Sequence, residues 1–307
     1  MEIIKKKDFN KFNSPGTIIA IGSFDGIHQG HQKIINKTIS SASEKNLYSG
    51  VFTFEPHPQE VISPENKPEY LTSKNQKISF LEQMGLDYYF EQEFTKKFSQ
   101  INFEDFISKI LVSQLGLKEI VVGNDFRFGY NGKGNIDKLK SLANKYDFQV
   151  NVVSPYKLKG KKVSSTRIRN LVKKGKIDMV NSCLGRPYCL EGEVVRGEGL
   201  GKRIGFPTAN LDLITSYVLP PRGVYIGYAY IDDNKYKAIT NFGSRPTFSG
   251  RIYTIEVHLI DFNENIYGDT ISVELLEFLR EEMNFKSTSE LIEQIEEDIL
   301  YTEQHLC

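Results

Sequence analysis

The sequence contains little cysteine and no long apolar run. Its three cysteines, Cys183, Cys189 and Cys307, are an odd number and lack metal-site spacing, which is typical of a reducing cytosol and argues against a disulfide framework. No apolar run approaches the ~20 residues that a membrane-spanning helix needs. Residues 1–7 are charged and lack the apolar core of a signal peptide. We therefore expect a cytoplasmic protein with no membrane partner.

An excess of charge of either sign is also absent. Lysine plus arginine and aspartate plus glutamate number 39 each, so the formal net charge is zero. Because a surface that binds nucleic acid is usually basic, this balance argues against such a partner. The length of 307 residues is sufficient for two domains.

The first half alternates apolar strand patterns with helical patterns, which predicts a parallel sheet covered on both faces. Residues 18–21 have the length and β-branching of a buried strand, a glycine turn follows, and a helical pattern begins near residues 28–31. This arrangement directs free backbone N–H groups at an anion. His28 and His31 share one face of the first helical turn and add donors. Two alternatives remain: a zinc site, for which a third ligand is missing, and a plain turn with two surface histidines.

Residues 22–31, Gly-Ser-Phe-Asp-Gly-Ile-His-Gln-Gly-His, resemble the FMN adenylyltransferase module of bacterial bifunctional riboflavin kinase/FAD synthetases. His-x-Gly-His is the signature of the nucleotidyltransferase superfamily. The resemblance implies a Rossmann-like α/β domain in which His28 and His31 are catalytic. It also implies that Gly22, Phe24 and Gly30 contact the nucleotide.

A long proline-rich excursion follows the second predicted strand, which spans residues 49–55. Long loops in compact domains are often lids or binding loops. His57 lies in this loop, where a lone histidine is either structural and exposed or part of a site. The family has a similar Phe-Glu-Pro-His-Pro run beside its active site, so the resemblance makes His57 a candidate for flavin binding.

Another predicted strand, residues 120–122, leads into Gly-Asn-Asp-Phe-Arg-Phe-Gly at residues 123–129. Ligands bind at such strand ends in open α/β sheets. The string is similar to a family motif, which implies that Asp125 and Phe126 contact the flavin. The alternative is that Asp125 only stabilises a turn.

A second helix N-terminus is predicted at Ser164 or Ser165, because serine is a good N-cap. The segment Ser-Ser-Thr-Arg-Ile-Arg resembles the second superfamily motif, Ser-Ser-Thr-x-x-Arg. Ser165, Thr166 and Arg169 would form a phosphate clamp; the alternative is a capped surface helix. No nucleophile is evident, and none is needed if the FMN phosphate attacks the α-phosphorus of ATP in line, with Mg²⁺ neutralising charge.

The pattern changes near residues 180–188 to consecutive strands with glycine and proline turns, which predicts a small antiparallel barrel or sandwich. Strands are expected at 189–196, 224–231, 236–241, 253–261 and 270–279, followed by a terminal amphipathic helix. We place the boundary near Ser182, with an adenylyltransferase domain at 1–182 and a kinase domain at 183–307.

A glycine-rich basic loop, residues 197–205, can cover phosphates with its backbone N–H groups. Gly-Phe-Pro-Thr-Ala-Asn follows at 205–210 and matches a motif of riboflavin kinases. Thr208 and Asn210 carry oxygen donors of the type that Mg²⁺ accepts, and the resemblance implies that they hold Mg²⁺ with ATP. Nucleotide contacts are expected at Gly201, Lys202 and Gly205. Lys202 replaces the usual family arginine and lacks its bidentate fork.

Glu256 stands in Ile-Glu-Val-His-Leu at 255–259, where alternation places Glu256 and His258 on one face. By itself this pattern is more typical of the solvent side of a half-buried strand. The family has its catalytic base at this glutamate. Arg280, in Phe-Leu-Arg, resembles a residue on the flavin side.

The resemblance covers nearly the whole chain and implies a bifunctional enzyme. The second domain would phosphorylate riboflavin with ATP to FMN, and the first would convert FMN and ATP to FAD and pyrophosphate. The alternatives are a flavin-sensing binding protein on the same scaffold and an enzyme with one of the two activities. The sequence predicts no oligomeric state.

Overall fold

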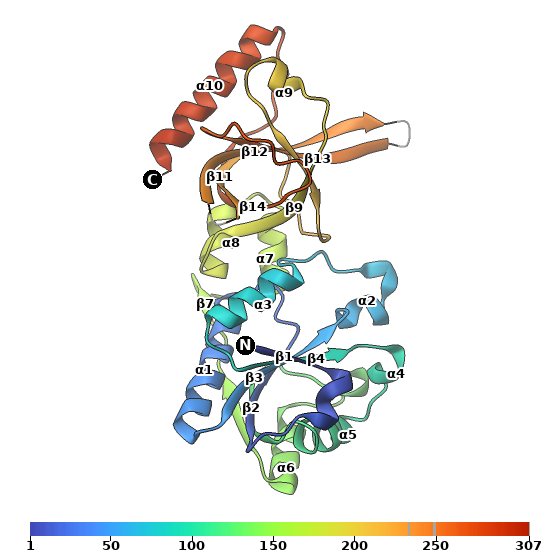
Figure 1. Ribbon diagram of the computed structural model, residues 1–307. Coiled ribbons are helices and arrows are strands. Elements are labelled where there is room, and N and C mark those ends of the chain that lie inside the picture. The colour runs from blue at the N-terminus through green and yellow to red at the C-terminus, as the bar shows by residue number, and fades with distance from the viewer. Residues whose placement is uncertain (233, 248–249, 307) are drawn as a thin grey trace. The chain divides into compact units, whose positions relative to one another are not determined.

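The computed structural model describes residues 1–232, 234–247 and 250–306 (Figure 1). Cys307 lies outside the described residues. The chain divides into two compact units. The first comprises Met1–Pro68 and Lys74–Ser164, and the second comprises Glu69–Ser73 and Ser165–Cys307.

The first unit contains a six-stranded sheet in the order β1-β4-β3-β2-β5-β6, and every neighbouring pair is parallel. Its strands are β1 (Glu2–Lys5), β2 (Thr17–Ile21), β3 (Tyr48–Glu55), β4 (Tyr88–Glu93), β5 (Leu117–Gly123) and β6 (Gln149–Val153). A short hairpin joins β7 (Lys157–Leu158) to β8 (Lys161–Lys162). The predicted parallel α/β domain is confirmed.

Apolar cores cover both faces of this sheet. Ala20, Val51 and Tyr89 pack with α1 and α3 on one face, and Phe52 and Phe90 pack with the segment 106–115 on the other. The helices are α1 (Gln29–Lys45), α2 (Pro58–Ile62), α3 (Lys74–Gln83), α4 (Lys96–Ser99), α5 (Phe103–Asp105) and α6 (Ile136–Tyr146), with short helical turns η1 (Lys6–Lys11), η2 (Pro64–Asn66), η3 (Phe106–Val112) and η4 (Tyr130–Gly132).

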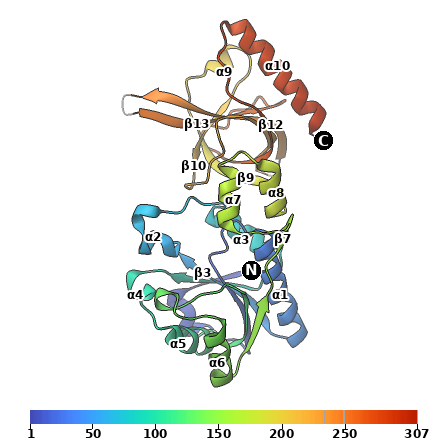
Figure 2. The ribbon, with the colours of Figure 1, turned by 180° about the vertical axis from the view of Figure 1, so that it is seen from behind.

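The second unit is built on a closed antiparallel barrel in the order β10-β13-β12-β11-β14-β9 (Figures 1 and 2). Its strands are β9 (Tyr188–Val195), β10 (Ala209–Leu213), β11 (Gly223–Ile231), β12 (Asn234–Thr247), β13 (Gly250–Leu259) and β14 (Thr270–Arg280). The barrel alternative is confirmed over the sandwich. The expected strands did not include β10, which is short and begins inside the Gly-Phe-Pro-Thr-Ala-Asn motif.

Among its described residues, the second unit has the helices α7 (Ser165–Val172), α8 (Ile177–Leu184), α9 (Leu200–Arg203) and the terminal α10 (Thr288–His305), which packs against β12 (Figure 2). Helix α8 packs on β9 and β14 and buries Ile177 and Val180. The compact division therefore falls after Ser164. The boundary near Ser182 stays a prediction about activity.

A short segment distant in sequence completes one edge of the second unit. The Tyr70 N–H donates to the Ser216 carbonyl at 2.8 Å, and the Val218 N–H donates to the Tyr70 carbonyl at 2.9 Å. The Ser73 hydroxyl donates to Glu191 at 2.6 Å. Throughout the described part of the chain, no helix has both the length and the apolar character needed to cross a bilayer.

Candidate active sites

The N-terminus of α1 follows β2 through a tight turn in which Phe24, Gly26 and Ile27 all have positive φ. His28 is the N-cap, and its Nδ1 accepts a hydrogen bond from the His31 N–H at 3.2 Å. No acidic residue lies in the first turn of this helix. The strand, turn and helix predicted for this segment are thus present, and the helix end is suited to an anion.

The two imidazoles stack on each other, with ring centroids 3.6 Å apart and planes inclined by 16°. Gly30 makes this possible, because a Cβ there would lie 3.0 Å from the His28 ring. Since Nδ1 of His28 accepts a hydrogen bond, neutral His28 carries its proton on Nε2. The ring donor that neutral His28 can offer to a ligand is therefore Nε2–H.

His31 is held in its neutral form. Burial, followed by the nearby His28 and Lys77, lowers the pKa of His31 well below its usual value. The Phe24 ring lies edge-on to His31 at 5.2 Å and is itself buried. Nδ1 of His31 is buried and has no hydrogen-bond partner among the described residues.

His57 caps α2 within the proline-rich excursion. Its Nδ1 accepts from the Gln59 N–H at 3.2 Å, and Glu60 accepts from the His57 N–H at 3.3 Å in a capping box. His57 thus has a structural role, which was one of the two alternatives for it. Flavin binding by His57 stays a prediction.

Asp125 lies just beyond the carboxyl end of β5, which is the neighbour of β2 in the sheet. Its carboxylate accepts a hydrogen bond from Lys162 of β8, which lowers the Asp125 pKa. Phe126 stacks on Phe128 with centroids 5.3 Å apart. A carboxylate and an aromatic ring therefore stand at the edge of the sheet where parallel folds bind ligands.

Ser165 begins α7 in the second unit, and Thr166 and Arg169 lie on the same helix. The Arg169 Nε–H donates to the Glu69 carbonyl at 2.7 Å. One nitrogen of the guanidinium thus orients the side chain through the backbone. The phosphate clamp expected here stays a prediction.

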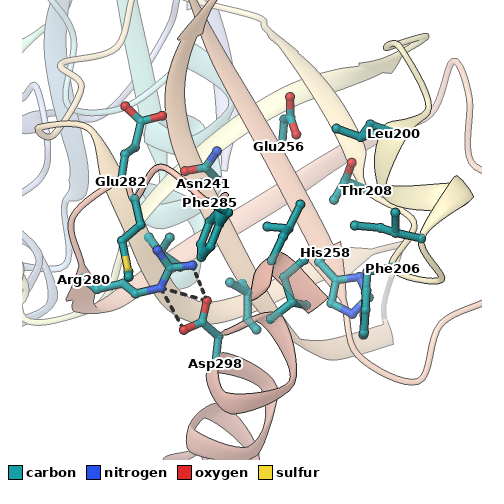
Figure 3. A pocket seen from close by; sticks show the side chains of 17 residues that line it. Leu200, Phe206, Thr208, Asn241, Glu256, His258, Arg280, Glu282, Phe285 and Asp298 are labelled. Atoms are coloured by element: carbon teal, nitrogen blue, oxygen red, sulfur yellow. Dashed lines mark hydrogen bonds and ion pairs between the residues drawn. The ribbon is translucent and has the colours of Figure 1, made fainter. Parts of the chain in front are cut away.

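A cavity of about 320 Å³ opens in the barrel (Figure 3). Polar lining residues include Thr208, Asn241, Glu256, His258 and Glu282, and apolar ones include Val224, Ile239, Phe285, Leu291 and Ile295. The cavity therefore offers both apolar surface and polar groups to a ligand.

Glu256 is directed to this cavity by the alternation of β13, in which Ile255 and Val257 are buried. In the barrel register Glu256 is opposite Asn210 of β10 and Asn241 of β12. Partners in an antiparallel register share a face. The three side chains therefore form a polar row across three strands.

The glycine-rich loop packs closely on the motif 205–210. A Cβ on Gly197 would lie 2.2 Å from Nδ2 of Asn210, and one on Gly201 would lie 2.3 Å from the Phe206 carbonyl oxygen and 3.4 Å from Oγ1 of Thr208. Any larger residue would displace these groups. The loop can cover this strand only because these positions are glycine.

Thr208 also lines a second cavity, of about 530 Å³, together with Lys202 and Gly205. The far wall of this cavity is the loop 262–267, which sequence reasoning missed because it lies outside every recognised motif. Thr208 thus borders two cavities, one next to Glu256 and one next to the basic loop.

Arg280 lines the first cavity, but its guanidinium is bound to Asp298 of α10. Nε lies 2.9 Å from Oδ1 and Nη2 lies 2.7 Å from Oδ2 (Figure 3). The exposed fractions of the side chains are 19% and 6%. This buried pair fastens α10 to the barrel. Asp298 was also missed, because its partner is 18 residues away and the local pattern marks only an amphipathic helix.

Family models match the two units in turn. The description FAD synthetase matches residues 10–167, and riboflavin kinase matches residues 184–306. Over the described residues, no group of three or more His, Cys, Asp or Glu side chains could hold a metal ion. These family matches, together with a helix end suited to an anion and the barrel cavities, define a transferase that acts on flavins and nucleotides.

Curated relatives that are similar over nearly the whole chain identify the family within this class. Proteins named bifunctional riboflavin kinase/FMN adenylyltransferase are 36% identical in Buchnera aphidicola from Schizaphis graminum, covering 95% of this chain and 94% of the relative. The Bacillus subtilis relative is 36% identical over 92% and 90% of the two chains, and the Escherichia coli K12 relative is 35% identical over 93% and 91%. The chain belongs to the family of bifunctional riboflavin kinase/FMN adenylyltransferases.

A solved structure described as a macrolide-efflux protein from Streptococcus pneumoniae has the same fold. It covers 99% of both chains with a TM-score of 0.89 and 30% sequence identity. The fold of both units is therefore one that has been observed in a crystal.

Proposed function

We propose that the chain makes FAD from riboflavin in two ATP-dependent steps. The barrel unit phosphorylates riboflavin to FMN, and the α/β unit adenylylates FMN with release of pyrophosphate. The observation that carries the kinase assignment is Thr208, which borders both the cavity next to Glu256 and the cavity next to Lys202. A phosphoryl group must pass between a flavin hydroxyl and a nucleotide, and these two cavities meet at that residue.

Glu256 is the proposed general base for the kinase step. It stands in the polar row with Asn210 and Asn241 and faces the first cavity. Its carboxylate would take the proton of the 5′-hydroxyl as that oxygen attacks the γ-phosphorus of ATP. The apolar side chains that line the cavity would hold the flavin ring system, and Arg280 would support those on α10 by keeping this helix in place.

The donors on the barrel fit a magnesium ion. Thr208 would offer a hydroxyl and Asn210 an amide oxygen, both hard oxygen ligands of the kind that Mg²⁺ accepts. When bound, Mg²⁺ neutralises phosphate charge during transfer. The glycine loop and Lys202 would position the nucleotide phosphates through backbone N–H groups and one ammonium.

His28 and His31 are the proposed donors for adenylyl transfer. Both are at the N-terminus of α1, and His31 is held neutral by burial. Their imidazoles would donate to phosphate oxygens, with the helix end favouring the negative charge. Gly30 leaves room for the stacked rings. Asp125 and Phe126 lie at the end of the adjacent strand, where they would contact the flavin. Ser165, Thr166 and Arg169 are proposed to bind phosphate as well.

The substrates are thus small molecules, namely riboflavin, FMN and ATP. The balanced charge supports the absence of a nucleic-acid partner, and the scarcity of cysteine supports a cytoplasmic location. Thr208, Asn210 and Glu256 are all present, which argues against a protein that only senses flavin.

Two variants with crossed effects test this proposal. Purified protein is incubated with Mg-ATP and either riboflavin or FMN, and the flavins are separated by chromatography. Glu256→Gln should lower FMN formation by ~10²–10⁴-fold, the usual contribution of a general base, while FAD formation from FMN is unchanged. His28→Ala with His31→Ala should show the reverse, with a loss of ~10²–10³-fold per donor.

Glu193→Gln is the matched control, since this carboxylate is exposed on β9 and lines neither cavity. It should leave both activities unchanged. Wild-type protein that binds flavin but forms neither product would support the sensing protein, and formation of one product only would support the single-activity enzyme.

A further inference from the structure

His258 contacts the segment that carries Thr208 through both a ring nitrogen and its ring. Its Nδ1 lies 2.8 Å from the carbonyl oxygen of Pro207. The imidazole also lies edge-on to Phe206, with centroids 6.0 Å apart and an angle of 77° (Figure 3). Two adjacent residues of the loop thus rest on one histidine of β13.

The strand pairing of the barrel explains why the Pro207 carbonyl has a side chain, and not a backbone N–H, as its hydrogen-bond donor. The pairing of β10 with β13 begins at Ala209, opposite Val257, so Pro207 precedes the ladder. His258 is the next residue of β13 in that direction and supplies a side-chain donor where the ladder ends. A carbonyl can only accept, so Nδ1 of His258 carries the proton.

We propose that His258 is a positioning residue for the magnesium–nucleotide site of the barrel. Its Nδ1–H fixes the peptide plane between Pro207 and Thr208, and that plane sets the direction in which the Thr208 hydroxyl points. His258 acts through Thr208 and takes no proton from substrate. This inference rests on the proposed kinase function, since it assigns Thr208 to the bound ion.

Three variants of His258 in the full-length chain can separate the role of Nδ1 from that of Nε2. The side-chain N–H of asparagine reaches the position of Nδ1, that of glutamine reaches the position of Nε2, and alanine has neither. His258→Asn should therefore keep the wild-type dependence on Mg²⁺. His258→Gln and His258→Ala should raise the Mg²⁺ concentration for half-maximal riboflavin phosphorylation by ~10–100-fold, the usual effect of losing an outer-shell partner of a metal ligand.

FMN adenylylation in the same molecule is the internal control, because its proposed donors His28 and His31 lie on α1 in the other unit. Its dependence on Mg²⁺ should be the same in all three variants. At saturating Mg²⁺, riboflavin phosphorylation should recover most of its wild-type rate in His258→Ala, as expected for a residue that positions a ligand. A general loss of folding would instead lower both activities at every Mg²⁺ concentration.

Two measurements do not depend on turnover. The chain has five histidines, so nitrogen NMR on histidine-labelled protein can identify His258 as the signal that disappears in His258→Asn. We expect this signal to show a protonated Nδ1 and an unprotonated Nε2. Electron paramagnetic resonance should show that His258→Ala and His258→Gln bind less Mn²⁺ in the presence of ADP than wild type and His258→Asn do.

Wild-type Mg²⁺ dependence and Mn²⁺ binding in His258→Ala would overturn the proposal, as would a His258→Gln variant that matches His258→Asn. An unprotonated Nδ1 would overturn it as well. Failure of the kinase proposal is a separate result: wild-type protein would then form no FMN, while the NMR and Mn²⁺–ADP measurements would still decide whether His258 orients a metal ligand.

Discussion

The contribution of α8 to the barrel predicts how the chain can be cut. A fragment of residues 165–307 contains α7 and α8, whereas a fragment of residues 183–307 begins inside the last turn of α8. The shorter fragment corresponds to the boundary near Ser182. We expect the longer fragment to be markedly more stable and to convert riboflavin to FMN.

The difference can be worked out from the contacts of α8. Ile177 and Val180 are 2% and 0% exposed. Burial of an aliphatic side chain contributes ~1.5–3 kcal/mol, so their loss costs about 3–6 kcal/mol. Asn181 donates to the Leu275 carbonyl at 2.9 Å and accepts from the Tyr188 N–H at 2.8 Å, and these two bonds add about 1–3 kcal/mol.

The sum, about 4–9 kcal/mol, is comparable with the whole stability of a typical domain, ~5–15 kcal/mol. It is an upper bound, because an unfolded chain already buries part of its apolar surface. Both fragments lack the segment 69–73 and its bonds to Ser216 and Val218, so that loss cancels in the comparison.

The assay is urea unfolding of the two fragments followed by circular dichroism, with FMN formation measured on each. Residues 165–307 should unfold cooperatively at a higher urea midpoint, and 183–307 should be unfolded or nearly so without urea. In the full-length chain, Asn181→Ala should lower the stability of the barrel by about 1–3 kcal/mol, because it removes both of these hydrogen bonds. Equal midpoints for the two fragments would refute the reasoning and support the boundary near Ser182.

Three further predictions follow from other contacts. Asp298→Ala should destabilise the barrel by ~3–5 kcal/mol, because it leaves the Arg280 guanidinium buried without its partner; urea unfolding measures this, and a loss below 1 kcal/mol would mean that the pair is solvated. Gly197→Ala should abolish riboflavin phosphorylation but leave FMN adenylylation intact, since its Cβ would overlap the Asn210 amide; an active variant would show that the loop can shift. Because the folded pKa of His31 lies below its unfolded value of 6.5, the unfolded state binds more protons and stability should fall as pH drops below 6.5. His31→Gln should lose less stability between pH 7 and pH 5 in thermal unfolding, and an equal loss would assign the effect to other groups.

Much of the first unit is predictable from local patterns. Apolar runs of strand length alternate with segments of helical spacing. A parallel sheet is the usual outcome, because each helix brings the chain back to the end of the sheet where the previous strand began. The turn after β2 is equally local, since glycine and an N-cap histidine define it within a few residues. Alternation in β13 placed Glu256 and His258 on one face, and both line the cavity.

Motifs located the two catalytic regions but not the partners of their residues. Nothing in the sequence around Arg280 indicates that its guanidinium group binds Asp298. Nothing around Pro207 indicates that its carbonyl accepts a hydrogen bond from His258. His57 looked ambiguous because a cap and a ligand site use the same ring nitrogens. The structure resolves what the ring does locally, as the cap of α2.

The sequence by itself determined the order of the two units, the type of each and the strings that carry their chemistry, because strand and helix periods and turn residues act over a few positions. Tertiary structure decided how the barrel closes, that α8 and the segment 69–73 belong to it, and which polar groups meet in the cavity. These contacts join residues that are tens of positions apart. They depend on register and packing, which no local pattern encodes.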